Sequence, residues 1–150
     1  IAPEPFDTAA EIARLKHAPG VGAVVTFSGI CRDEDGRLAA LEIEHYPGMA
    51  ETEVARIVDE AVACWPVSAI TVIHRVGVIP VGEDIVLVAT ASAHREAAFA
   101  AAEFLMDYLK TRAPFWKKEH PVAGGEEAWV GSRETDAARA RRWQGGTRKG

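Results

Sequence analysis

Apolar residues recur every three or four positions in several parts of the chain, which is the spacing of one helix face. This spacing predicts a helix over residues 50–64, with inward residues Val54, Ile57, Val58, Ala61 and Val62. It predicts a longer helix over residues 95–111, with an apolar stripe of Phe99, Ala102, Leu105, Met106 and Leu109. Short helices are expected over residues 8–17, where Thr8 and Glu11 fit a capping box, and over residues 136–143, capped by Thr135.

Strand patterns lie between these helices. Residues 21–30 and 84–91 are β-branched and nearly all apolar, which predicts strands buried on both faces. Residues 38–46 alternate apolar and charged positions, as in a half-exposed antiparallel strand. Further strands are expected over residues 69–76 and 128–130, and the segment 77–82, around Pro80, is expected to be a turn.

The resulting order is α, β, β, α, β, β, α, β, α. The first two strands flank an acidic turn at residues 33–36, so we expect them to pair as a hairpin. This order predicts an α+β fold with a mixed or largely antiparallel sheet and flanking helices. A chain of 150 residues suits one domain, expected over residues 1–143, with a disordered tail over residues 144–150.

The long helix is followed by a break with a local excess of positive charge. Pro114 cannot continue a helix, so the helix should end near Thr111 and continue as an extended segment anchored by Phe115 and Trp116. The chain has a formal net charge of -5, yet no acid interrupts the cations Lys110, Arg112, Lys117 and Lys118. Lys110 and Lys117 could point into one cavity. The alternative is a solvated face whose cations complement the helix dipole.

Other cations stand where anions commonly bind. Arg32 follows the first strand, and His94 and Arg95 lie at the start of the long helix, where free backbone N–H groups favour anions. The alternatives are an exposed arginine and a structural histidine. The helix from Arg95 to Lys110 would be about 22 Å long, so its two ends cannot line one small pocket in one subunit. We therefore expect an elongated groove or a site shared across a dimer.

Composition argues against several other classes of protein. The mild acidity disfavours nucleic-acid binding, no apolar run reaches the roughly 20 residues that span a bilayer, and no signal-peptide pattern is present. Cys31 and Cys64 are the only cysteines and no histidine has metal-ligand spacing, so we expect a reducing cytoplasm and no metal or cofactor. A nucleophilic role for Cys31 is the minor alternative to a packing role.

Five segments of the chain resemble those of one known family, the large, catalytic subunit of molybdopterin synthase (the MoaE family). They cover most of residues 20–135: GAVVTFSGICR (22–32), LEIEHYPGMAE (41–51), VIHRVGVIPVGED (72–84), SAHREAAF (92–99) and MDYLKTRAPFWKKE (106–119). The resemblance implies an α/β-hammerhead-like fold and a sulfurtransferase of molybdenum cofactor biosynthesis. Such an enzyme converts cyclic pyranopterin monophosphate to molybdopterin by inserting two sulfurs as a dithiolene.

The resemblance also implies partners. The sulfur comes from a thiocarboxylate on the C-terminal Gly-Gly of a small ubiquitin-like subunit, and two such subunits flank a homodimer of the large subunit in a heterotetramer. No nucleic acid and no membrane are implied. The rival hypothesis is a non-enzymatic phosphate-ligand or regulatory binding module that uses the same cations.

Seven residues receive roles from the resemblance. Lys110 and Lys117 match catalytic lysines, one expected to act as an acid/base or form a transient adduct while the other holds anionic oxygen. Pterin- and phosphate-binding positions are matched by Arg32, His94, Arg95 and Lys118, and Arg133 matches an arginine that reaches the neighbouring subunit's site. Asp33 stands where relatives often carry asparagine, and the loop 121–127 and the tail after Trp143 also differ.

One expectation concerns the charge of the lysines. A lysine amine is protonated at its usual pKa of about 10.4 and is then a weak nucleophile. Nearby Arg112 and Lys118, with partial burial by Phe115 and Trp116, would favour the neutral form. The sequence does not decide which lysine plays which part.

Overall fold

The computed structural model describes residues 1–123, 125–131 and 134–144, and it has the α+β architecture expected from the sequence. The helices are α1 (Thr8–Lys16), α2 (Met49–Cys64), α3 (Arg95–Thr111) and α4 (Glu134–Arg141). The strands are β1 (Ala23–Ile30), β2 (Leu38–His45), β3 (Val67–His74), β4 (Gly77–Pro80), β5 (Asp84–Ser92), β6 (Phe115–Pro121) and β7 (Ala128–Val130). Arg133 and the tail from residue 145 onward lie outside the described residues.

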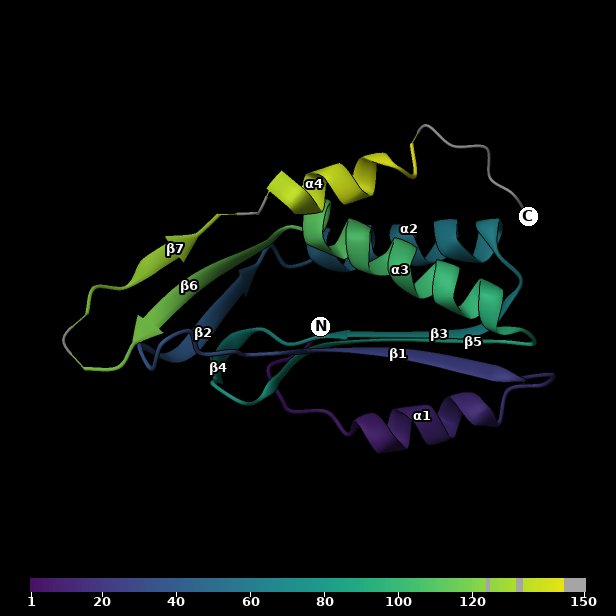
Figure 1. Ribbon diagram of the computed structural model, residues 1–150, viewed down its shortest axis with the longest axis horizontal. Coiled ribbons are helices and arrows are strands. Elements are labelled where there is room, and N and C mark those ends of the chain that lie inside the picture. The colour runs from purple at the N-terminus through teal and green to yellow at the C-terminus, as the bar shows by residue number, and fades with distance from the viewer. Residues whose placement is uncertain (124, 132–133, 145–150) are drawn as a thin grey trace.

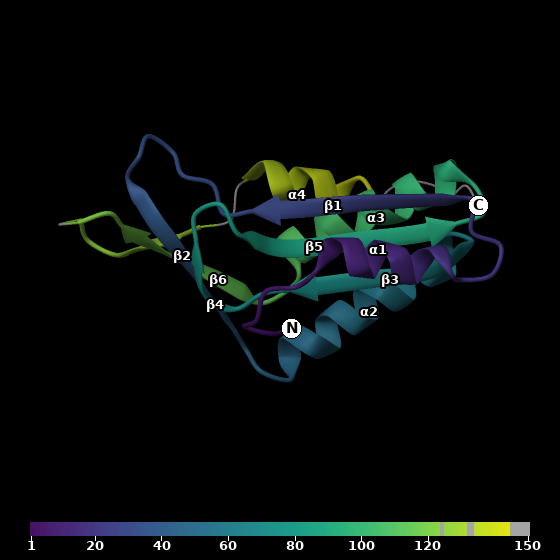
Figure 2. The same cartoon turned by 90° about the horizontal axis from the view of Figure 1, so that it is seen from below.

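The strands form two antiparallel sheets. One has the order β1-β5-β3 and the other the order β4-β2-β6-β7. Helices α2 and α3 cover one face of the first sheet and α1 covers the other (Figure 1). The second sheet extends beyond one end of the first (Figure 2), so the C-terminal end of α3 lies at the junction between them. The prediction of antiparallel sheets with flanking helices is confirmed.

The predicted hairpin of the first two strands is wrong. Strand β1 pairs with β5, whereas β2 pairs with β4 and β6 in the other sheet. Backbone bonds divert the chain after β1, because the Cys31 N–H donates to the Glu83 carbonyl and the Gly82 N–H donates to the Cys31 carbonyl. The Asp33 carboxylate then accepts from the N–H groups of Arg37 and Leu38 and closes the loop before β2. Asparagine carries an oxygen at the same place, so Asp33 preserves this loop.

The burial of the strands follows their place in each sheet. Strand β5 is central and buried along its length, as predicted. Strand β1 was expected to be buried on both faces, which is wrong: it is an edge strand, and Phe27 and Ile30 are 42% and 55% exposed. The segment predicted as a turn around Pro80 contains β4, because residues 77–80 complete the edge of the second sheet beside β2.

The helices agree with the predicted ranges within a few residues, and four details differ. Asp7, not Thr8, caps α1 by accepting a hydrogen bond from the Ala10 N–H at 3.1 Å. Val62 of α2 and Phe99 of α3 are 55% and 61% exposed, although their spacing placed both on an inward apolar face. Helix α4 begins at Glu134, so Thr135 lies within it rather than capping it. Helix α3 ends at Thr111 and β6 begins at Phe115, as the proline break predicts.

Candidate functional site

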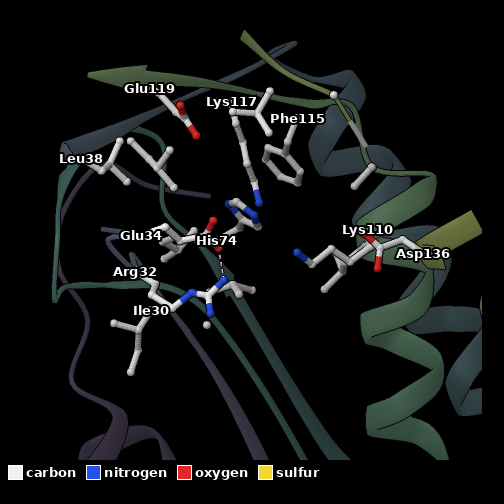
Figure 3. Close-up of a pocket in the computed structure, with 18 of the residues that line it drawn as sticks. Ile30, Arg32, Glu34, Leu38, His74, Lys110, Phe115, Lys117, Glu119 and Asp136 are labelled. Atoms are coloured by element: carbon white, nitrogen blue, oxygen red, sulfur yellow. Dashed lines mark hydrogen bonds and ion pairs between the residues drawn. The ribbon is translucent and has the colours of Figure 1, made fainter. Parts of the chain in front are cut away.

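A cavity of about 690 Å³ lies where the end of β1, strands β2 and β6, and the last turns of α3 meet. Three of the predicted cations line it: Arg32, Lys110 and Lys117 (Figure 3). Its apolar wall explains the exposed residues of β1, since Phe27 and Ile30 belong to the lining. The size falls in the range typical of small-molecule sites.

The alternation of β6 decides which of its residues enter the cavity. Successive side chains of a strand point to opposite faces. Phe115, Lys117 and Glu119 accordingly line the cavity, whereas Trp116 and Lys118 do not belong to the lining. Lys110 reaches the same space from the last turn of α3. Two lysines seven residues apart thus meet in one cavity, as their positions around the proline break predict.

Lys118 contacts a different set of residues. Its ammonium is paired with Glu127, and this bond raises the pKa of Lys118 above its ordinary value. The amine also lies 6.0 Å from the ring centre of Trp129. In this subunit Lys118 is therefore held on the face of β6 away from the cavity, against Glu127 and β7.

His94 and Arg95 lie at the opposite end of α3 from Lys110 (Figure 1). Both are exposed, and neither belongs to the cavity lining. This is the separation that the predicted helix length requires. Arg133 lies outside the described residues. Of the six predicted residues that the structure describes, the subunit by itself brings three together in the cavity.

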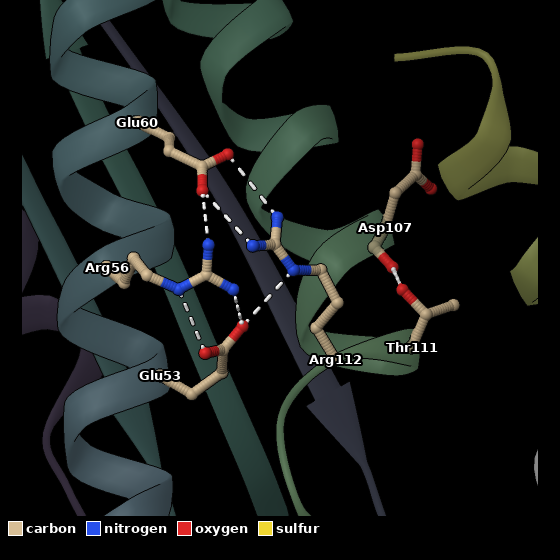
Figure 4. A network of polar contacts seen from close by, with 6 residues as sticks. All are labelled: Glu53, Arg56, Glu60, Asp107, Thr111 and Arg112. Atoms are coloured by element: carbon tan, nitrogen blue, oxygen red, sulfur yellow. Dashed lines mark hydrogen bonds and ion pairs between the residues drawn. The ribbon is translucent and has the colours of Figure 1, made fainter. Parts of the chain in front are cut away.

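Arg112 does not crowd the lysines, contrary to our expectation. Its guanidinium contacts two carboxylates of α2, with Nε 3.1 Å from Glu53 Oε1 and one terminal nitrogen 3.1 Å from Glu60 Oε1 (Figure 4). Arg56 pairs with the same two glutamates. Hydrogen bonds from Arg56, together with the charges of both arginines, lower the pKa of Glu53. Arg112 therefore links α3 to α2 through ion pairs and does not serve to shift the charge of the cavity lysines.

The carboxylates of the cavity offset part of its positive charge. Arg32, whose side chain is 70% exposed, forms an ion pair with Glu34 at the rim. Glu119 and Asp136 also belong to the lining (Figure 3). An anionic ligand would therefore meet cations on fixed elements, Lys110 on a helix and Lys117 on a strand, and a more exposed Arg32 at the rim.

His74 lines the cavity from the end of β3, although it was not predicted as a site residue. The side chain is 8% exposed and its ring stacks on Phe115, with ring centres 3.9 Å apart. Burial, with the charges of Lys117 and Lys110 adding to it, lowers the pKa of His74 to about 4, so the ring is neutral at pH 7. No spacing in the sequence marks this histidine, because its position depends on how two distant strands meet.

Cys31 is buried, with 1% of its surface exposed, and burial raises the pKa of its thiol. A buried thiol of raised pKa is a poor nucleophile, so the minor alternative for Cys31 is not supported. Among the described residues, no group of three or more histidine, cysteine and acidic side chains is arranged to hold a metal ion. None of the described helices is long and apolar enough to cross a bilayer.

Comparisons with known proteins agree with one another. The family described as "MoaE protein" matches residues 1–112. The molybdopterin synthase catalytic subunit of Mesorhizobium japonicum is 64% identical over 140 residues, which are 93% of this chain and 88% of that protein. The solved structure of molybdopterin cofactor biosynthesis protein E from Burkholderia multivorans is 47% identical, with a TM-score of 0.79, and the match covers 95% and 93% of the two chains. The crystal structure of molybdopterin synthase from Staphylococcus aureus is 33% identical, with a TM-score of 0.75, over 85% and 93% of the chains.

Proposed function

The chain belongs to the MoaE family, and we propose that its cavity works as the catalytic site of a molybdopterin synthase. Membership makes the chain an enzyme of molybdenum cofactor biosynthesis, because close relatives over nearly its whole length are catalytic subunits of that synthase. The alternative of a non-enzymatic phosphate-ligand or regulatory module is therefore set aside. The single observation that carries the proposal is the meeting of Lys110 and Lys117 in one cavity.

The pterin substrate is assigned to this cavity. Cyclic pyranopterin monophosphate combines a flat ring system with an anionic phosphate. The apolar lining from Met106 and Leu109 suits the rings, and the cations Arg32, Lys110 and Lys117 suit the anionic oxygens. The volume of about 690 Å³ also leaves room for the end of a peptide beside the pterin.

The sulfur donor is a second subunit, in keeping with relatives that are named as catalytic subunits. Its C-terminal Gly-Gly thiocarboxylate would enter as an extended tail. One lysine ammonium then neutralises the thiocarboxylate or phosphate, while the other exchanges a proton or forms a transient adduct with the tail. In each transfer a C–S bond to the pterin forms in place of an oxygen substituent, water cleaves the C–S bond to the tail, and the tail leaves as an ordinary carboxylate. Two such transfers give the dithiolene. The cytoplasm is the proposed compartment, and both cysteines are free in the structure.

The assembly proposed is a homodimer flanked by two sulfur-carrier subunits. The support is the position of His94 and Arg95, which are exposed at the end of α3 remote from Lys110. These residues would serve the cavity of the neighbouring subunit, at a helix N-terminus suited to phosphate. Arg133 is assigned the same role in trans. Lys118 is assigned to phosphate binding after release from Glu127.

A reconstitution tests the proposal. The purified chain is mixed with cyclic pyranopterin monophosphate and with the thiocarboxylated small subunit, and the dithiolene product is measured by mass spectrometry. We expect product only with all three components, and none when the small subunit ends in an ordinary carboxylate. Tight pterin binding without product would instead restore the binding-module hypothesis.

A further inference from the structure

His74 is the last residue of β3, and two contacts fix its ring. One face lies against Phe115 of β6, with ring planes 9° from parallel. The nitrogen Nδ1 lies 2.8 Å from the backbone carbonyl of Arg75. The ring is thus tied to both sheets at their junction, where it lines the cavity together with Lys110 and Lys117.

The contact with Arg75 determines which ring nitrogen carries the proton. A carbonyl oxygen only accepts, so Nδ1 must donate its N–H to it. A neutral imidazole has one N–H, and this leaves Nε2 as an unprotonated acceptor. Burial keeps the ring in this neutral state at physiological pH. The backbone carbonyl of Arg75, and not a ligand, therefore sets the Nδ1–H tautomer of His74.

The amine of Lys117 points toward this imidazole from the next wall of the cavity (Figure 3). Both residues sit on regular strands, so their relative position is fixed by the fold. Other charged groups share the cavity with them, and the whole set comprises Arg32, Arg37, Lys110, Glu34, Asp35, Glu119, Glu126 and Asp136. The amino terminus and Lys110 also act on the ring electrostatically.

We propose that His74 is a positioning residue for the reaction: its Nε2 accepts a hydrogen bond from the Lys117 ammonium and holds that amine toward the substrate. A long lysine side chain has many rotamers, and an acceptor on a rigid ring restricts them. A neutral acceptor does this without cancelling the lysine charge, whereas a carboxylate would compete with the anionic substrate. The inference rests on the proposed role of Lys117 in sulfur transfer.

Two substitutions separate positioning from a structural role. In His74→Asn the amide can still donate to the Arg75 carbonyl, but nothing reaches the position of Nε2. In His74→Gln the amide oxygen reaches that position. Both variants lose the ring that stacks on Phe115, so they share this packing defect. They differ in the cavity acceptor and in the Arg75 bond, but that bond is kept only in His74→Asn and so cannot cause its lower rate.

We expect kcat to fall about tenfold to a hundredfold in His74→Asn, the range for losing a hydrogen bond to a charged group. We expect His74→Gln to recover most of that rate, with similar KM values for the pterin in both variants. Thermal melting checks that the two variants fold equally well. Equal kcat values in two equally folded variants would overturn the inference, as would a fall confined to KM.

A nitrogen NMR measurement gives a second readout that needs no turnover. In protein labelled with ¹⁵N-histidine, we expect His74 to show the Nδ1–H tautomer at pH 7. The Nε2 signal should move in Lys117→Met and stay nearly unchanged in the matched variant Lys110→Met. An unchanged signal in Lys117→Met would overturn the inference. Failure of the wild-type protein to form product would instead refute the proposed function. The spectra would still show whether Nε2 of His74 contacts Lys117.

Discussion

Phe115 lies flat against the imidazole of His74, with ring centres 3.9 Å apart and planes 9° from parallel. Phe115 lies on β6 and His74 on β3, so the two residues belong to different sheets. Both line the same cavity. The pair therefore joins the two sheets at the point where the lysines converge. Packing at this junction should affect both stability and catalysis.

The substitution Phe115→Ala tests this junction. It removes a half-buried ring and its stacking partner, so we expect the free energy of unfolding to fall by about 1–3 kcal/mol. Urea denaturation measures the change. Trp116→Ala is the matched control, because Trp116 is the next residue, is 48% exposed and points to the other face of β6. A larger loss from the control would contradict this account.

The buried histidine makes stability depend on pH. Its pKa is about 4 in the folded protein and near 6.5 when exposed, so the unfolded chain takes up the proton first as the pH falls. The neutral ring contributes up to about 3 kcal/mol to the free energy of unfolding. This contribution is fully present above about pH 6.5 and is lost as the pH falls towards 4. His74→Gln lacks this component.

The difference in unfolding free energy between the wild type and His74→Gln should therefore shrink between pH 7.5 and pH 4.5. Carboxylates titrate alike in both proteins and cancel in the difference. A difference that stays constant over this range would show that the ring is not held neutral by the fold.

The contact between α2 and α3 should matter for stability. Arg112 is a quarter exposed and bridges Glu53 and Glu60, so Arg112→Ala leaves two neighbouring carboxylates with one cation fewer. We expect a loss of about 1–2 kcal/mol in chemical denaturation. Arg56→Ala, in the more exposed half of the same network, should cost less. A larger loss of stability in Arg56→Ala than in Arg112→Ala would contradict the role given to Arg112 between α2 and α3.

The shared site of the dimer can be tested by mixing two variants, Lys117→Ala and Arg95→Ala, under conditions that let subunits exchange. We expect each variant to be inactive by itself. If Arg95 serves the neighbouring cavity, each mixed dimer has one site with both defects and one intact site. Random exchange makes half the dimers mixed, so activity should return to roughly a quarter of the wild-type value. No recovery despite demonstrated exchange would show that Arg95 does not act in trans.

The sequence predicted the local elements well because their signals are local. The apolar stripe of α3, the break at Pro114 and the buried pattern of β5 each depend on nearby residues. The pairing of β1 was predicted wrongly because a neighbouring strand in the sequence was taken as a neighbour in the sheet. Backbone bonds at Cys31 and the loop at Asp33 decide otherwise.

The same distinction holds for the site. Lys110 and Lys117 could be predicted because they flank one break in the chain, and alternation along β6 separates Lys117 from Lys118. His74 could not be predicted, because its partners come from a strand some forty residues away whose register no local pattern fixes. Arg112 belongs to the same group of cations in the sequence, but its partners are Glu53 and Glu60 of the distant helix α2.

The central claim is that Lys110 and Lys117 act together in sulfur transfer from the cavity they share. The most direct test is a single-turnover measurement of dithiolene formation with Lys110→Ala, Lys117→Ala and the exposed control Lys16→Ala, each supplied with the pterin and the thiocarboxylated subunit. We expect each cavity variant to lose at least about a hundredfold in rate, as for removal of an acid/base or charge-stabilising group, and the control to match the wild type. Near-normal turnover in folded Lys110→Ala or Lys117→Ala would contradict the claim.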